Sequence, residues 1–202
     1  MEWIKVIQPW FMAGGTVMYV LCVCSLVVVF LGCERYLVFA RLDSGHMFAV
    51  RFYHVMMRRQ YEEAVEMARE TRGALARMIM VAAQMETVAQ RQAYIELETG
   101  RVLTLLQERL YYISLIVTAA PLLGLLGTIH GMMYSFQLLS TGGEHALVVT
   151  GGVSEALVAT SFGIIIALVA MVMHTYFRQR HDRIIGDIEL CFSAWEWYQK
   201  EG

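Results

Sequence analysis

The stretch ISLIVTAAPLLGLLGTIHGMMYSFQLL, residues 113–139, decides the fold. It contains no Lys, Arg, Asp or Glu, and it exceeds the about 20 residues that a helix needs to cross the ~30 Å hydrocarbon core of a bilayer. Residues 9–32 and 153–177 are apolar stretches of similar length, in which Glu155 is the one acidic residue. A soluble protein with one core does not need three such stretches. The sequence therefore predicts an all-α membrane protein with three transmembrane helices.

Composition excludes several other classes of protein. The chain is 57% hydrophobic and 17% charged, against about 45–50% and about 25% in average soluble domains. A net charge of -2 provides no basic surface for nucleic acid. The four cysteines have no zinc-ligand spacing and are interpreted as reduced apolar side chains. The sequence holds no phosphate-binding loop, metal-spaced His pair or nucleophile with a base, so we expect neither an enzyme nor a cofactor or metal.

Basic residues predict how the chain crosses the membrane, because Lys and Arg concentrate in cytoplasmic segments near span ends. The segments between and around the spans hold one, eleven, no and four basic residues in chain order. We therefore expect the N-terminus outside and the C-terminus inside. The expected segments are an outer N-terminus at 1–8, spans at 9–32, 113–139 and 153–177, a cytoplasmic helical domain at 33–112, an outer loop at 140–152, and a cytoplasmic C-terminal helix at 178–202.

The cytoplasmic segments have helical patterns throughout. Residues 61–70 consist mostly of strong helix formers, and Gly73 is expected to separate two helices. No Gly or Pro lies between Gly100 and the second span, which predicts one long helix from near Thr87 to near Leu139. The third span is expected to continue into the tail as well. The apolar face predicted there comprises Ile184, Ile185, Ile188, Phe192 and Trp195.

The second and third spans each carry a face of small, weakly polar residues. At 100° per residue, such residues of each span share one side of the helix. Pro121 frees one backbone carbonyl and is expected to bend the second span. Small faces suit both packing of these two spans against each other and the lining of a polar passage. The residues concerned are Gly124, Gly127, Thr128, Gly131 and Ser135 in the second span, and Ala156, Thr160, Gly163, Ala167, Ala170 and His174 in the third.

Thr128 and Thr160 are the hydroxyl groups of the two small faces. Each could bond to its own helix backbone or line a shared passage for ions. Glu155 at the outer end of the third span is either an interfacial residue or the mouth of such a path. No Asp lies in any span, and no two carboxylates are spaced to relay a proton across the bilayer. A passage of this kind would need a titratable group from another chain.

Three stretches carry a resemblance to a known family. APLLGLLGTIHGMMYSF at 120–136 and GGVSEALVATSFGIIIALVA at 151–170 resemble the signature of the MotA/TolQ/ExbB proton-channel family. AGGTVMYVLCVCSLVVVFLGCERY at 13–36 resembles the opening of its ExbB-type members. Three spans point to the ExbB/TolQ branch. The chain departs from the family pattern at two places. Members commonly have Pro where this chain has Val20, and Ala-Ile-Pro where it has Ala167-Leu168-Val169. Because the third span lacks this proline, we expect it to be straighter.

The resemblance implies a homopentamer in the bacterial inner membrane, with residues 1–8 and 140–152 in the periplasm. Its pore would hold a dimer of single-span ExbD- or TolR-like proteins whose membrane Asp carries the proton. By motif match, Thr128 and Thr160 would line the ion pathway, with Glu155 opening the third span and Pro121 as the second-span proline. Proton motive force would then drive mechanical work on an outer-membrane or envelope system. Among such systems, the resemblance favours TonB-dependent uptake, with a TonB-like protein as a further partner.

Other functions remain open from the residues themselves. A TolQ-like motor for envelope maintenance, or a motor for motility or secretion, would use the same spans. A non-conducting membrane scaffold would use the small faces only for packing. A substrate transporter fits less well, because neither an inverted repeat nor a pair of broken helices is present.

Overall fold

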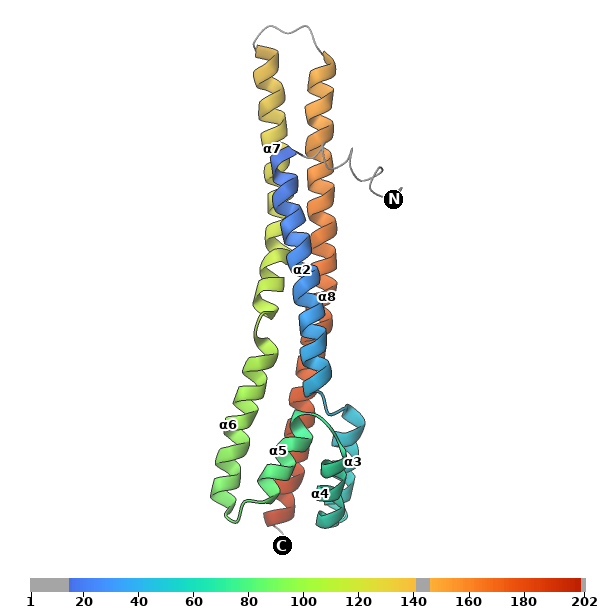
Figure 1. Cartoon of the computed structure of the whole chain (residues 1–202), viewed down its shortest axis with the longest axis vertical. Helices are drawn as coiled ribbons and strands as arrows, with labels where there is room; N and C mark the ends of the chain where they lie inside the picture. The colour runs from blue at the N-terminus through green and yellow to red at the C-terminus, as the bar shows by residue number, and fades with distance from the viewer. Residues whose placement is uncertain (1–14, 141–145, 201–202) are drawn as a thin grey trace. The chain divides into compact units, whose positions relative to one another are not determined.

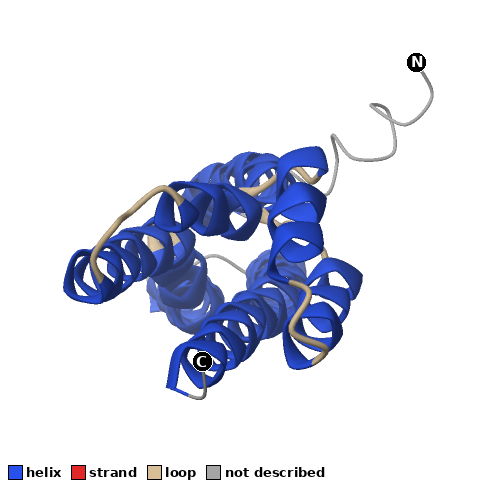
Figure 2. Cartoon of the chain, turned by 90° about the horizontal axis from the view of Figure 1, so that it is seen from below, coloured by secondary structure: helices blue, strands red, loops and turns tan. Residues whose placement is uncertain are grey.

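The computed structural model describes residues 15–140 and 146–200, and every element in this part of the chain is a helix (Figures 1 and 2). The all-α prediction is therefore confirmed. The expected outer N-terminus at 1–8 and residues 141–145 of the expected outer loop lie outside the described residues, whereas residues 146–152, also expected in that loop, form the start of a helix. The helices are α2 (Gly15–Leu42), α3 (His46–Met57), α4 (Tyr61–Glu70), α5 (Ala74–Ala83), α6 (Val88–Gln107), α7 (Leu110–Ser140) and α8 (Ala146–Lys200).

The chain forms two compact units. One, here called the apolar unit, comprises Met1–Gly32 and Tyr111–Thr175, and the other, the polar unit, comprises Cys33–Leu110 and Tyr176–Gly202. Helices α2, α7 and α8 contribute residues to both. Three helical stretches are long and apolar enough to cross a membrane, namely Thr16–Met57, Val88–Gln137 and Gly152–Gln199. The prediction of three membrane helices is thus confirmed.

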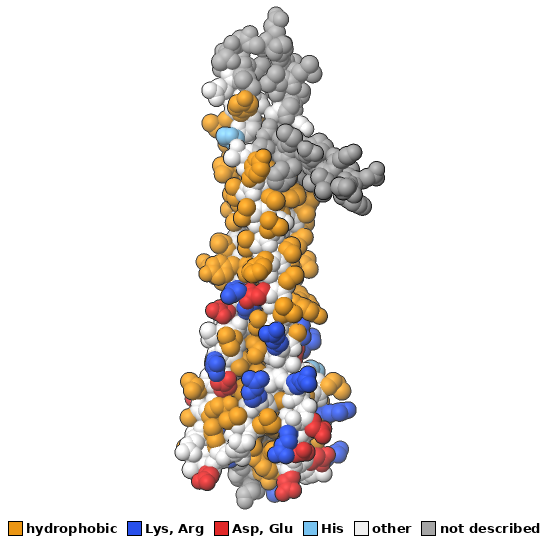
Figure 3. All heavy atoms as spheres, in the orientation of Figure 1, with side chains coloured by type: hydrophobic (Ala, Val, Ile, Leu, Met, Phe, Trp, Pro, Cys, Tyr) orange, Lys and Arg blue, Asp and Glu red, His pale blue; other side chains and the backbone are white. Residues whose placement is uncertain are grey.

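The apolar unit exposes large hydrophobic side chains on all three of its helices. In the space-filling view, hydrophobic side chains cover its described part, whereas charged side chains lie over the polar unit (Figure 3). Soluble monomers rarely expose an apolar surface of this extent, so this unit is suited to lipid. The residues exposed by half or more include Tyr19, Leu26, Phe30, Leu122, Met133, Phe136, Leu157, Ile165 and Val172.

The polar unit has its own core of aromatic and aliphatic side chains. The Phe52 and Trp195 rings lie 6.3 Å apart, and Phe39 stacks on Phe177 at 5.4 Å. Most of the predicted apolar face of the tail is buried, which confirms that prediction: Ile184, Ile188, Phe192 and Trp195 are each less than one tenth exposed. All four cysteines are free thiols, as expected.

Gly73 and Thr87 stand directly before two helices of the polar unit, α5 and α6. Gly73 separates α4 from α5, as predicted, and its φ of 124° is one that residues with side chains rarely adopt. A Cβ there would also lie 2.7 Å from the Ser44 Cα. At the start of α6, the Thr87 hydroxyl accepts a hydrogen bond from the Gln90 N–H at 3.4 Å, which is an N-cap.

The prediction of one unbroken helix from Thr87 to Leu139 is wrong. Its outer limits agree with the structure, but the helix is interrupted at Glu108 and Arg109, between α6 and α7. Glu108 is extended, with φ -51° and ψ 135°, and Arg109 has a φ of 65°. By contrast, α7 continues through Pro121, and α8 runs without interruption through residues 167–169.

Candidate functional site

Helices α7 and α8 approach each other so closely that glycine is required on both. A Cβ built on Gly163 would lie 2.6 Å from the Ala120 carbonyl oxygen, and one built on Gly124 would lie 2.9 Å from the Thr160 Cα. Real Cβ atoms do not reach such distances from backbone atoms. The small faces predicted on the two spans therefore meet each other along one seam within the chain.

Thr160 lies on this seam and Thr128 follows the seam residue Gly127 on α7, and their hydroxyls form different hydrogen bonds. The Thr160 hydroxyl on α8 donates to the Gly124 carbonyl on α7 at 2.8 Å. The Thr128 hydroxyl, one turn further along α7, donates to the Leu125 carbonyl of its own helix at 2.7 Å. Both side chains are half-buried. A hydroxyl that donates its proton still has lone pairs that accept, so each threonine presents a hydrogen-bond acceptor.

The other predicted residues of the small faces are buried, apart from the proline and His174. Gly127 lies against Ala159, where an added Cβ would come within 2.9 Å of the Ala159 Cβ. A Cβ built on Gly131 would lie 3.0 Å from the Gly152 carbonyl oxygen. Ala167 is 8% exposed. Pro121 is half-buried within α7. Glu155 belongs to α8, but its side chain lies outside the described part of the structure.

The seam supports the packing interpretation for the glycines directly. Gly124, Gly127, Gly131 and Gly163 all have a neighbouring helix where a side chain would be. Their role as pore-lining positions concerns an assembly of several chains and stays a prediction. The threonines differ from the glycines, because part of each threonine residue remains accessible.

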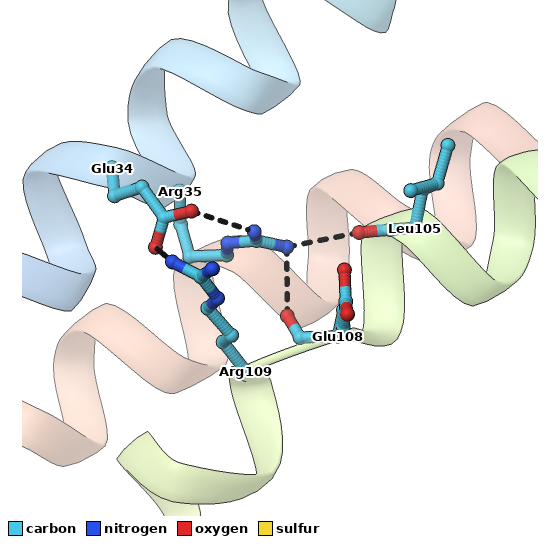
Figure 4. Close-up of polar contacts among 5 residues, drawn as sticks. All are labelled: Glu34, Arg35, Leu105, Glu108 and Arg109. Carbon is cyan, nitrogen blue, oxygen red and sulfur yellow. Dashed lines mark hydrogen bonds and ion pairs between the residues drawn. The ribbon is translucent and has the colours of Figure 1, made fainter.

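A second group of interacting side chains lies in the polar unit, where α6 ends (Figure 4). Arg35, on α2, is 3% exposed. Its Nη1 donates to the Leu105 carbonyl at 2.9 Å and to the Glu108 carbonyl at 2.7 Å. One guanidinium nitrogen thus binds two carbonyls at the C-terminal end of α6, where helix carbonyls lack partners within the helix.

Glu34 ties both arginines of this group together. Its Oε1 accepts from Arg35 Nη2 at 3.2 Å, and its Oε2 lies 2.6 Å from Arg109 Nη1. Glu34 and Arg35 therefore form an ion pair, and Arg109 extends it. Burial alone would raise the pKa of the Glu34 carboxyl, but the hydrogen bonds from Arg109 and Arg35 outweigh burial and hold this pKa below its usual value.

Sequence reasoning missed most of this second group. The adjacency of Glu34 and Arg35 is a signal for an ion pair, but nothing in the local pattern marks Leu105, Glu108 or Arg109 as its partners. Arg35 and Leu105 are 70 residues apart in the chain, and Arg109 stands in a run with the composition of an ordinary helix. Only the tertiary fold brings them together.

Comparison with known proteins agrees with these features. The family model of the MotA/TolQ/ExbB proton channel family matches residues 56–190. A putative biopolymer transport protein, ExbB-like 3, from Synechocystis sp. is 33% identical over 194 residues, which cover 90% of this chain and 92% of that protein. The Tol-Pal system protein TolQ from Pseudomonas aeruginosa is 34% identical over 82 residues, 40% of this chain and 36% of TolQ.

The biopolymer transport protein ExbB from Salmonella typhimurium is 33% identical over 81 residues, 38% of this chain and 33% of that protein. Together with the three apolar helices and the seam between α7 and α8, these matches show that the chain belongs to the MotA/TolQ/ExbB proton channel family.

Proposed function

We propose that this protein is the channel-forming subunit of a motor in the bacterial inner membrane that converts proton motive force into mechanical work. The observation that carries the proposal is the state of the two threonine hydroxyls. Thr160 and Thr128 both donate their protons to backbone carbonyls. Each oxygen is thereby left as an acceptor on a half-buried surface.

Acceptors of this kind suit a protonated carboxyl group. A neutral carboxylic acid has one O–H to donate, whereas a carboxylate only accepts hydrogen bonds. A partner Asp would therefore bind Thr160 or Thr128 better when protonated, and deprotonation would release it toward another polar contact. The driving energy is about 2.3 kcal/mol per charge for each 100 mV of membrane potential. That amount exceeds a single hydrogen bond between membrane helices, about 0.6 kcal/mol on average.

The titratable group would come from a second protein. The three spans contain no Asp, Lys or Arg, which supports a partner that supplies the carboxyl. We propose a homopentamer around a dimer of single-span ExbD- or TolR-like proteins, each with a membrane Asp. In this arrangement Glu155 lies at the outer end of the pathway, and the half-buried sides of Thr128 and Thr160 line it.

An ExbB-type role in TonB-dependent uptake at the outer membrane is the preferred specific function. Support comes from the ExbB-like relative that aligns over 92% of its own length. A TolQ-like role in the cell envelope is the second candidate, because TolQ of Pseudomonas aeruginosa matches at 34% identity and ExbB of Salmonella typhimurium at 33%. We place the N-terminus in the periplasm and the C-terminus in the cytoplasm.

Native mass spectrometry tests the assembly. The full chain is extracted mildly after co-expression with the single-span protein encoded beside it. We expect five copies of this chain with two of the partner. A monomer or dimer without bound partner would contradict the channel proposal and favour a non-conducting scaffold.

A further inference from the structure

The break between α6 and α7 has no local cause in the sequence. Residues 101–120 contain neither Gly nor Pro, and their composition favours one continuous helix. Yet Arg109 has a φ of 65°, in the left-handed region that residues with side chains rarely adopt. The local preference and the structure disagree here, so contacts from elsewhere in the chain must hold the break.

Arg35 occupies the place of the missing backbone donors. In a continuous helix, the Leu105 carbonyl would accept from the N–H of residue 109 and the Glu108 carbonyl from the N–H of residue 112. In the structure, Arg35 Nη1 donates to both carbonyls, at 2.9 and 2.7 Å. Two of the carbonyls that the break leaves without a backbone donor are therefore satisfied by one buried guanidinium (Figure 4).

Glu34 acts on the other side of the break. Its carboxylate contacts the Arg109 guanidinium at 2.6 Å and the Arg35 guanidinium at 3.2 Å. It thus engages the side chain of the residue with the unfavourable backbone conformation and, at the same time, orients the arginine that caps α6. Loss of the carboxylate would remove both effects.

We propose that Glu34, Arg35 and Arg109 form a latch that selects the broken form of a two-state element, whose other form is one continuous helix from α6 into α7. They are positioning residues, because they act through the helix that carries Thr128. The latch itself follows from the contacts above. Its consequence for proton flow rests on the proposed function.

Amide hydrogen exchange on the full chain in lipid nanodiscs tests the latch. The first backbone N–H groups of a helix lack partners within it, so those at the start of α7 would gain partners if the helix became continuous. We expect Arg35→Gln and Glu34→Gln to slow exchange at residues 110–112 by about tenfold, a shift of about 1.4 kcal/mol between the two forms. A residue with only a structural role would give faster exchange when removed. Unchanged or faster exchange in both variants would overturn the latch.

Further variants keep the test informative if one of these fails to fold. Arg109→Gly removes the ion pair but readily adopts positive φ, so exchange should stay at the parent rate, whereas Arg109→Ala should slow it. Exchanging the charges with Glu34→Arg and Arg109→Glu should restore part of the parent behaviour. Glu98→Gln is the matched control, because Glu98 forms an ion pair with Arg101 within α6 rather than with a residue of the latch. An identical response of Arg109→Gly and Arg109→Ala would also contradict the proposal.

Proton flux into liposomes, measured with the co-expressed partner, separates the latch from the function. Latch variants should lower partner-dependent flux by about tenfold with the complex still assembled, and Arg109→Gly should retain it. If the parent complex conducts no protons, the proposed function fails while the exchange data still decide the latch. If exchange responds as expected and flux does not, the latch stands and its role in coupling is refuted.

Discussion

At the scale of single residues, the two threonines show that identical side chains on matching faces can have different structural roles. Thr160 links α8 to α7 through the Gly124 carbonyl, whereas Thr128 bonds within α7. Removal of the Thr160 hydroxyl therefore loses a contact between helices as well as an acceptor. Removal of the Thr128 hydroxyl loses an acceptor and a hydrogen bond within α7, but no contact between helices.

We expect Thr160→Val to abolish partner-dependent proton flux while the complex still assembles. The lost hydrogen bond contributes about 0.6 to 1 kcal/mol, which is too little to unfold the apolar unit. Thr160→Ser retains the hydroxyl and is the matched control, so it should keep most of the flux. The measurement is proton uptake into liposomes that contain the co-expressed complex. Full activity of Thr160→Val would remove this residue from the ion pathway.

The lowered pKa of the Glu34 carboxyl makes the stability of the folded chain depend on pH. Its pKa is lower in the folded chain than the usual value of 4.5, so its contribution is fully present above about pH 4.5. The contribution is lost as pH falls through the lowered folded pKa, because the unfolded chain then binds the proton more readily. We expect the melting temperature in detergent to fall between pH 5 and pH 3, to a smaller extent in Glu34→Gln. An equal pH dependence of the melting temperature in parent and variant would show that Glu34 does not contribute to it.

At the scale of helices, the seam between α7 and α8 predicts opposite effects for two glycines of α8. Gly163→Ala would place a Cβ against the Ala120 carbonyl oxygen, and overpacking of this kind costs about 1 to 3 kcal/mol. Gly186 has no atom within 4 Å of a built Cβ, so Gly186→Ala should stabilise the helix by about 0.5 to 1 kcal/mol. Thermal unfolding in detergent compares the two. Equal melting temperatures would show that the seam tolerates separation.

The seam and the break show which parts of the helices could be predicted. Small residues spaced along Gly124, Gly127 and Gly131 marked a close-packed face, and the structure places a helix against it. The end of α6 gave no such signal. Its cause is a guanidinium 70 residues away in the chain, and helix propensity contains no information about contacts at that separation.

At the scale of the whole molecule, the distribution of basic residues predicts the orientation in the membrane. The segment 33–112 has eleven Arg and the outer loop 140–152 has no basic residue. A green fluorescent protein fused at the C-terminus should therefore fluoresce. Alkaline phosphatase inserted in the loop at 140–152 should be active, and the same enzyme fused at the C-terminus should not. The reverse pattern would overturn the orientation and the direction of proton flow with it.

The whole-molecule prediction succeeded where periodicity and length carry the information. Three long apolar stretches became three helices able to cross a membrane, and residues 61–70 form α4 with the bounds expected. The ion pathway could be predicted only as residue types on a face. Whether Thr128 and Thr160 face a pore depends on neighbouring chains, whose contacts no pattern within one chain specifies.

The buried contacts of Arg35 also have a consequence for biosynthesis. Its two carbonyl partners are made about 70 residues later, which takes roughly 4 to 14 s at 5–20 residues per second. Throughout that interval the guanidinium has Glu34 beside it but must take its remaining hydrogen bonds from water or lipid headgroups, because unsatisfied charged groups are costly in hydrocarbon. We therefore expect the residue that later completes the end of α6 to keep the end of the nascent first span at the membrane surface until synthesis has passed Glu108.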